Sequence, residues 1–89
     1  MLYYISYRIF ESGAQEKFMK AIDELGESLT IFPNSKVLDS DSDVNKIFEK
    51  LYATIDPIDQ IMILPFKLDK IQGFISNPAI KWLKERVKA

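Results

Sequence analysis

The sequence predicts a single α+β domain in which two helices cover one face of a four-stranded antiparallel sheet. Three observations predict this fold class: a first segment with strand-like alternation, two segments with apolar residues at helical spacing, and a short hairpin between them. The chain has 89 residues and no internal repeat or low-complexity tract. This length suits one hydrophobic core, so we expect one domain over residues 1–89.

The first segment, residues 2–10, is rich in aromatic and β-branched residues, which favour strands. Successive side chains of a strand point to opposite faces of the sheet. The alternation gives one uniformly apolar face, formed by Tyr3, Ile5, Tyr7 and Ile9, and one mixed face, formed by Tyr4, Ser6, Arg8 and Phe10. We therefore expect this segment to be a central strand of the sheet.

The next two segments have helical spacing. Ser12 and Gln15 have the spacing of a capping box, and Gly26 is a typical helix stop, which together predict a helix over residues 13–26. In the second segment, Ser42 or Asp43 is placed to cap the helix, and Asp56-Pro57 is placed to end it. Its apolar stripe is the clearest periodic signal of the chain and consists of Val44, Ile47, Phe48, Leu51, Tyr52 and Ile55.

Three further strands are predicted around these helices. The turn residues Pro33-Asn34-Ser35 separate residues 29–32 from residues 36–39, which indicates a hairpin of two short strands. Residues 60–67 form a continuous apolar run, which is typical of a strand with both faces covered. Because Pro65 cannot donate a ladder hydrogen bond, this last strand is expected at an edge of the sheet.

The C-terminal residues are expected to add a short strand and a helix. Residues 73–76 have strand character, and Asn77-Pro78 is a typical helix start, with Asn77 as the N-cap and Pro78 in the first helical position. The helix would continue through Ile80, Leu83 and Val87. The order strand–helix–strand–strand–helix–strand, followed by this extension, is the ferredoxin-like arrangement.

In that arrangement the second face of the sheet has no helix over it, although apolar side chains point there. An exposed apolar patch on a small protein usually marks an interface. We therefore expect a homodimer, or the C-terminal helix folded across the sheet. Either the set Met62, Leu64 and Phe66 or the pair Ile61 and Ile63 would face this side. The candidate interface residues are Tyr4, Phe10, Phe32, Met62, Leu64, Phe66 and Phe74.

The composition excludes several chemistries. The chain has no Cys and no His, so it can form no disulfide, thiolate nucleophile, imidazole base or Cys/His zinc site. No small-molecule cofactor, metal or catalytic residue is expected. We see no membrane-spanning or targeting segment, and we expect a soluble, cytoplasmic protein with no membrane partner.

The charge is unevenly distributed along the chain. Residues 1–66 carry six Lys/Arg and eleven Asp/Glu, a net charge of −5, whereas residues 67–89 carry six Lys/Arg and two Asp/Glu, a net charge of +4. A basic extension on an acidic body can bind RNA, DNA or the acidic side of another chain. The candidate binding residues are Tyr4, Ser6, Arg8, Lys81, Lys84, Arg86 and Lys88.

Other motifs have weaker chemical meaning. The acidic run over residues 39–43 lacks the Gly and the Glu that a calcium loop needs at its sixth and twelfth positions, so it is interpreted as turn and helix-start residues. Asp56 and Asp59 form a carboxylate pair that is interpreted as part of a turn. A second hypothesis is a ribonuclease that uses Tyr7, Ser6 or this Asp pair.

The chain resembles the small SinR-like bacterial proteins, and through them the VapD-type toxin ribonucleases and the ferredoxin-like nucleases of CRISPR systems. The resemblance covers the first strand, Tyr4-Ile5-Ser6-Tyr7-Arg8-Ile9, the helix end Leu25-Gly26, the segment Ile55-Asp56-Pro57-Ile58-Asp59, the hydrophobic strand that follows, and Trp82-Leu83. It implies a ferredoxin-like fold and a homodimer. In the nucleases an Asp of the first strand binds a divalent metal, and Arg8 stands at that position here.

An arginine offers no lone pair to a metal ion and stays protonated. The first hypothesis is therefore a non-catalytic homodimeric module that binds a nucleic acid or a protein. A third hypothesis is an assembly subunit, in which the positive extension meets the acidic body of another chain.

Overall fold

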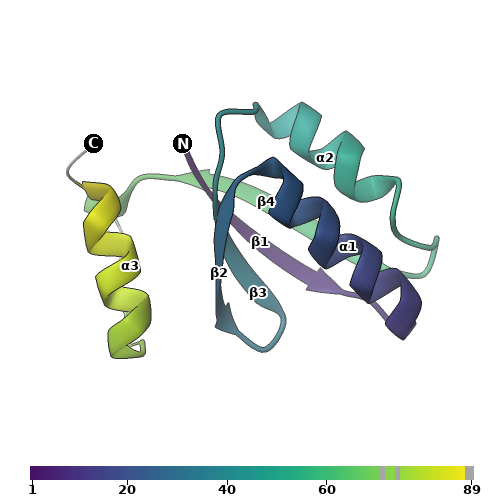
Figure 1. The fold of residues 1–89 in the computed structure, drawn as a ribbon, viewed down its shortest axis with the longest axis horizontal. Coiled ribbons are helices and arrows are strands. Elements are labelled where there is room, and N and C mark those ends of the chain that lie inside the picture. Colours follow the sequence, from purple (N-terminus) through teal and green to yellow (C-terminus); the bar gives the residue numbers. More distant parts are fainter. Residues whose placement is uncertain (71, 74, 88–89) are drawn as a thin grey trace.

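The computed structural model describes residues 1–70, 72–73 and 75–87 and has an α+β architecture, with a four-stranded antiparallel sheet and three α-helices over these residues. The arrangement is compatible with a ferredoxin-like fold. Figure 1 shows the elements in chain order. Their bounds are β1 (Leu2–Arg8), α1 (Ser12–Leu25), β2 (Glu27–Phe32), β3 (Ser35–Asp39), α2 (Val44–Tyr52), β4 (Gln60–Phe66), the 3₁₀ turn η1 (Leu68–Lys70) and α3 (Asn77–Val87).

The sheet has the strand order β2-β3-β1-β4, and every neighbouring pair is antiparallel. Strand β1 is central, as its alternation predicted, and β4 is an edge strand, as Pro65 predicted. The β2–β3 pairing contains an irregularity between Thr30 and Phe32, just before the hairpin turn.

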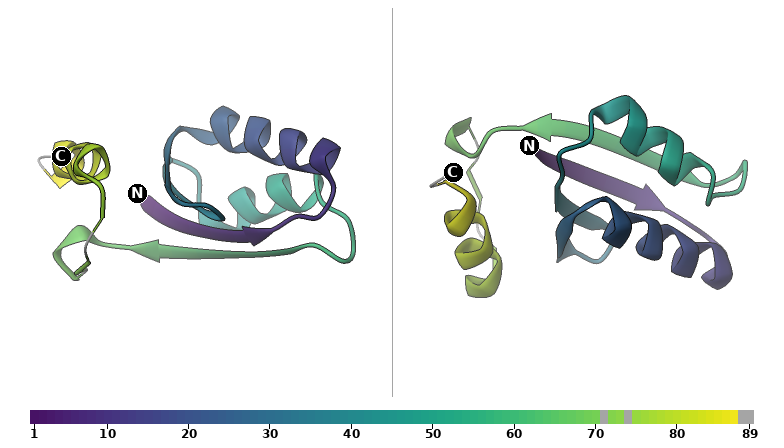
Figure 2. Two further views of the ribbon diagram at one scale, coloured as in Figure 1. Left: turned by 90° about the horizontal axis from the view of Figure 1, so that it is seen from below. Right: turned by 45° about the horizontal axis from the view of Figure 1, so that its top comes forward.

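The core lies between one face of the sheet and helices α1 and α2. Figure 2 shows both helices on the same side of the strands. The predicted apolar face of β1 is fully buried there, and the ring of Tyr7 lies 4.9 Å from the ring of Phe18 on α1. The other members of this core are Tyr3, Ile5, Ile9, Ala14, Ala21, Ile22, Leu38, Ile47 and Leu51.

The register between β1 and β4 settles which side chains of β4 face the core. Ile63 lies opposite Ile5, and Ile61 lies opposite Tyr7, so both isoleucines point toward the helices and pack against the core. Met62, Leu64 and Phe66 therefore point to the opposite face. Of the two alternatives that the continuous apolar run left open, the structure selects these three residues.

The α1–β2 connection depends on Gly26. An added Cβ at Gly26 would clash with the backbone oxygen of Asp39, and the residue has φ +158°. The same junction is held by the Ser40 hydroxyl, which donates a 2.7 Å hydrogen bond to the Leu25 carbonyl. The helix stop at Gly26 is thus confirmed, and its cause is the close approach of the end of β3.

The helix starts differ in part from the prediction. The predicted capping box at Ser12 is wrong, because the N-cap is Glu11, which makes no side-chain cap hydrogen bond. The Gln15 side chain instead donates to the Ile9 carbonyl at 3.4 Å. For α2, the prediction is confirmed in Asp43, whose carboxylate accepts a 2.8 Å hydrogen bond from the Lys46 N–H.

The C-terminal extension differs more. The described residues of 73–76 form no strand, and Phe74 lies outside the described residues, so the predicted short strand is not found there. A 3₁₀ turn, η1, follows β4 instead. Helix α3 includes Asn77, and the Ser76 hydroxyl accepts a 3.4 Å hydrogen bond from the Ala79 N–H, so Ser76 takes the capping place predicted for Asn77.

Helix α3 lies on the other side of β2 from α1 (Figures 1 and 2). Its Ala79 and Leu83 are buried, with exposed fractions of 3% and 9%. The C-terminal helix therefore covers the β2 side of the face that α1 and α2 leave open.

Over the described residues, none of the helices combines the length and the apolar character that crossing a bilayer requires.

The Gly26 junction yields a first prediction. We expect Gly26→Ala to lower the free energy of unfolding by about 2–3 kcal/mol, because the new methyl group meets backbone that cannot move independently. Gly13→Ala is the matched control, since its Cβ would meet only the flexible Glu11 carboxylate at 3.5 Å within a helix. The control should match or exceed wild-type stability in urea unfolding. Equal effects of both substitutions would contradict the assignment.

Tyr7 yields a second prediction. Burial raises the pKa of the Tyr7 hydroxyl above its usual value of 10.0. As the pH rises, the unfolded chain therefore loses this proton before the folded chain does, so the contribution of Tyr7 to stability is complete below about pH 10 and is lost above it. In urea unfolding between neutral and strongly alkaline pH, Tyr7→Phe should lose less stability than wild type. Tyr52→Phe, at an exposed ring, should follow the wild-type curve.

Candidate functional site: an apolar groove between the sheet and helix α3

A groove of about 670 Å³, open to solvent, lies between helix α3 and the face of the sheet that α1 and α2 leave uncovered. All four strands reach it, and the residues after β4 close one side. The groove is predominantly apolar, and among its described lining residues only Lys84 is charged. Its lining residues are Tyr4, Ile31, Phe32, Val37, Leu64, Pro65, Phe66, Leu68, Gln72, Gly73, Ile75, Ile80, Leu83 and Lys84.

Most of the predicted interface residues lie on this face. Tyr4, Phe32, Leu64 and Phe66 line the groove, and Met62 is exposed on the same face of β4. Phe10 is also exposed but lies beyond the end of β1, outside the groove lining. Phe74 lies outside the described residues.

Of the residues that α3 brings to the groove, Lys84 was predicted as a binding residue, whereas Ile80 and Leu83 were not. Ile80 and Leu83 were predicted to lie in a helix, but nothing local indicated that this helix would form a wall beside the sheet. Val37 was expected in a short strand. In the structure it is buried and lies opposite Tyr4 in the β1–β3 register. The helical spacing of Ile80 and Leu83 was the one available signal for an apolar side of α3.

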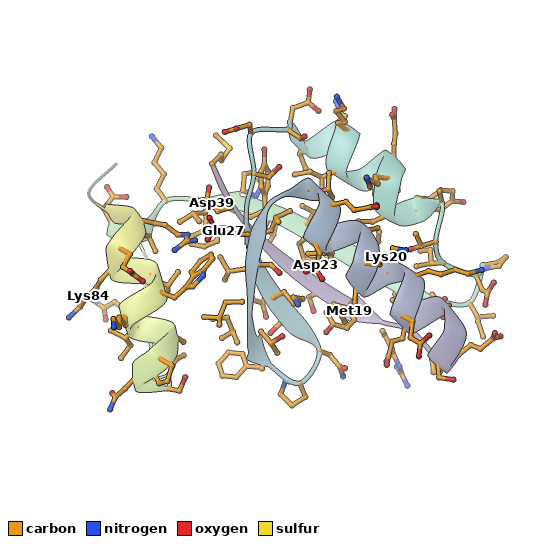
Figure 3. All side chains as sticks on the ribbon, viewed as in Figure 1. Met19, Lys20, Asp23, Glu27, Asp39 and Lys84 are labelled. Atoms are coloured by element: carbon orange, nitrogen blue, oxygen red, sulfur yellow. The ribbon has the colours of Figure 1, made fainter. Side chains whose placement is uncertain are left out.

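Arg86 fixes α3 to the end of the sheet. Its Nη2 lies 2.7 Å from Glu27 Oε2, and its Nε lies 3.2 Å from Asp39 Oδ2. These two acidic residues are opposite each other in the β2–β3 register, so their like charges would repel without a cation between them. Figure 3 shows both carboxylates at the end of the hairpin that faces α3.

The same guanidinium is also held from within the helix. Its central carbon lies 3.4 Å from the centre of the Trp82 ring, and Nη1 donates a 3.1 Å hydrogen bond to the Trp82 carbonyl. The Arg86 side chain is only 15% exposed. The charge of Arg86 is therefore paired within the molecule, and its contact with a nucleic acid or a partner stays a prediction.

The other predicted cations that the structure describes, Arg8, Lys81 and Lys84, lie at two separate places. Lys81 and Lys84 are exposed on the same side of α3 and share a shallow hollow beside the groove. Figure 3 shows Lys84 on the side of α3 away from β2. Lys88 lies outside the described residues.

Arg8 is at the other end of the sheet. It is the last residue of β1, whose first residue, Leu2, pairs with Asp39 beside Arg86. The Arg8 guanidinium lies over the Phe10 ring, 5.0 Å from its centre. Ser6 is half-buried on the open face between these two ends. The structure thus separates Arg8 from the lysines of α3.

The residues proposed for a relocated nuclease site do not converge. Tyr7 is buried toward the helices, whereas Ser6 points to the opposite face of the same strand. The Asp59 carboxylate is buried and accepts hydrogen bonds from the backbone N–H groups of Phe10, at 3.1 Å, and Asp56, at 2.9 Å. Asp59 therefore orders the loop between α2 and β4 and ties it to the end of β1.

No group of three or more acidic side chains that could hold a metal ion occurs over residues 1–70, 72–73 and 75–87. A comparison with protein-family models finds no match, and a comparison with curated proteins finds none either. The resemblance to SinR-like proteins and to the nucleases stays a prediction. The candidate site is therefore the groove, whose described lining is predominantly apolar.

The contacts of Arg86 yield a third prediction. Trp82 is the only tryptophan, so its fluorescence reports directly on α3. Arg86→Ala should shift the Trp82 emission to the red, because α3 loses its attachment to Glu27 and Asp39, and it should lower the free energy of unfolding by about 1 kcal/mol. Lys84→Ala, on the same helix, is the control and should leave the emission in place. Unchanged emission in Arg86→Ala would show that α3 is held by its apolar side chains alone.

Proposed function

We propose that the protein is a non-catalytic binding module that takes up part of another protein chain in the groove between the sheet and α3. The groove itself carries the proposal. It is open to solvent and has a predominantly apolar lining with one described charge, at Lys84. Its strands also expose Phe32, Met62 and Leu64, with exposed fractions of 51%, 53% and 47%. Exposed apolar surface of this kind favours a protein partner.

The arrangement of cations favours a protein over a nucleic acid. Binding to a phosphate backbone needs several cations along one surface. Here Arg86 is neutralised by Glu27 and Asp39, and Arg8 is at the far end of β1 from that ion pair. Binding of RNA or DNA through Tyr4, Ser6 and the α3 lysines is the other hypothesis from the sequence, and the experiment below separates the two.

The positions of Tyr7, Ser6 and Asp59 support the non-catalytic part of the proposal. A general acid or base must reach the same reacting group as the nucleophile that it serves. These three side chains belong to the core, the open face and a loop respectively.

Homodimer formation through the groove is the simplest form that a protein contact could take.

Site-specific photocrosslinking tests the proposal. A photoreactive residue is placed at Phe32 or at Met62, both on the open face, and at Lys20, which Figure 3 shows on α1, as the control. After irradiation in the cells that encode the protein, we expect adducts from the two groove-face positions and none from Lys20. The adducts should resist nuclease and be lost on protease treatment.

Two results would contradict the proposal. Equal adducts at all three positions would mean that the groove has no special role. Adducts that nuclease removes would identify RNA or DNA as the occupant and would favour the nucleic-acid hypothesis.

A further inference from the structure

A second exposed apolar surface lies on helix α2. The side chains of Val44, Phe48 and Tyr52 are exposed by 36%, 44% and 63%, and the rings of Phe48 and Tyr52 stack with their centres 5.4 Å apart. The three residues are spaced four apart, so they form a slightly oblique row along one flank of the helix, next to the buried Ile47 and Leu51, which we name the α2 ridge. In the sequence these residues belong to the predicted core stripe, but only Ile47 and Leu51 of α2 are buried.

The two sides of the α2 ridge carry different charges. At about 100° per residue, Asn45 and Glu49 follow the ridge on its solvent side, while Lys46 and Lys50 lie on the opposite side of the helix. Lys50 is directed toward α1, where its Nζ lies 3.2 Å from Glu24 Oε1. The ridge is therefore apolar and is bordered on its solvent side by Glu49, the one acidic residue of α2, which also lines a hollow with Lys46 and Lys50.

The groove has the complementary properties. It is concave and apolar, and the charged residue in its described lining is Lys84, which shares a neighbouring hollow with Lys81 and Glu85. A helix that presents apolar side chains along one side is a form of ligand that hydrophobic grooves bind. We infer that the α2 ridge of a second copy of this chain occupies the groove, with Glu49 of that copy facing Lys84. This inference rests on the proposed function and names the partner.

Charge and shape disfavour contacts between identical surfaces. A groove-to-groove contact would bring the Lys84 side chains of both copies together and would leave two concave surfaces facing each other. A ridge-to-ridge contact would bring the two Glu49 side chains together. The ridge-to-groove contact pairs opposite charges and fits a convex surface into a concave one, and it joins two different surfaces of the same chain.

Complementary variants test the inference. Tyr52→Arg damages only the ridge, and Leu64→Glu damages only the groove; both positions are exposed, and Trp82 emission verifies that α3 stays docked. In sedimentation velocity we expect wild type to self-associate and each variant to associate about thirtyfold more weakly. An equimolar mixture of the two variants should form 1:1 dimers, because one supplies an intact ridge and the other an intact groove. Lys20→Ala is the control and should behave as wild type.

A disulfide experiment keeps the test independent of those variants. The chain has no cysteine, so Tyr52→Cys and Leu64→Cys proteins can be mixed under oxidising conditions without competing thiols. We expect a disulfide-linked heterodimer, and far less product from either protein alone or from a mixture with Lys20→Cys.

Three results would overturn the inference. The first is that wild type stays monomeric up to millimolar concentration. The second is that Tyr52→Arg self-associates as strongly as wild type, because the ridge would then have no part in the contact. A mixture of the two variants that stays monomeric would also overturn it. If the chain is monomeric but the groove still gives adducts with a different protein in cells, the inference fails and the proposed function stands. If the groove gives no adducts at all, both fail.

Discussion

Strand β1 buries Tyr3, Ile5 and Tyr7 beneath α1 and α2, and this burial determines the position of the remaining surfaces. A strand has two faces, so the burial of these three side chains places Tyr4, Ser6 and Arg8 on the opposite face. The pairing of β1 with β3 and β4 then aligns Val37 and Leu64 with Tyr4 in one cross-strand row. The apolar floor of the groove therefore follows from the packing of the core on the other side of the sheet.

Helix α3 converts this floor into a groove because it covers only one side of it. The Arg86 ion pairs join α3 to the two strands farthest from β4, through Glu27 on β2 and Asp39 on β3. The register of β2 and β3 places those two carboxylates opposite each other, so a cation is favoured there. The side of the face that β4 forms stays exposed, and the apolar residues of α3 become a wall of the groove.

The alternation of β1, the edge position of β4 and the presence of three helices could be predicted, because each is encoded by neighbouring residues. The orientation of β4 could not, since a continuous apolar run has no alternation and only the pairing of Ile63 with Ile5 distinguishes its faces. The role of Arg86 could not be predicted either. Its partner Glu27 is 59 residues away, and the local sequence shows only one cation among several in a basic extension. The same limit applies to Asp59, whose carboxylate binds the distant backbone of Phe10.

The charge asymmetry of the sequence has two consequences of different kinds. Part of the positive charge of the extension is neutralised within the chain. There the largely buried Arg86 side chain forms ion pairs with Glu27 and Asp39 of the negative body. Among the other charged residues that the structure describes, Lys81 and Lys84 are exposed beside the groove and Glu49 is exposed beside the α2 ridge. Exposed charges contribute little to folding stability, and in protein contacts they act mainly on which surfaces meet. The internal ion pairs thus hold α3 beside the sheet, whereas Lys84 and Glu49 are the exposed charges that we infer to meet when the α2 ridge of a second copy occupies the groove.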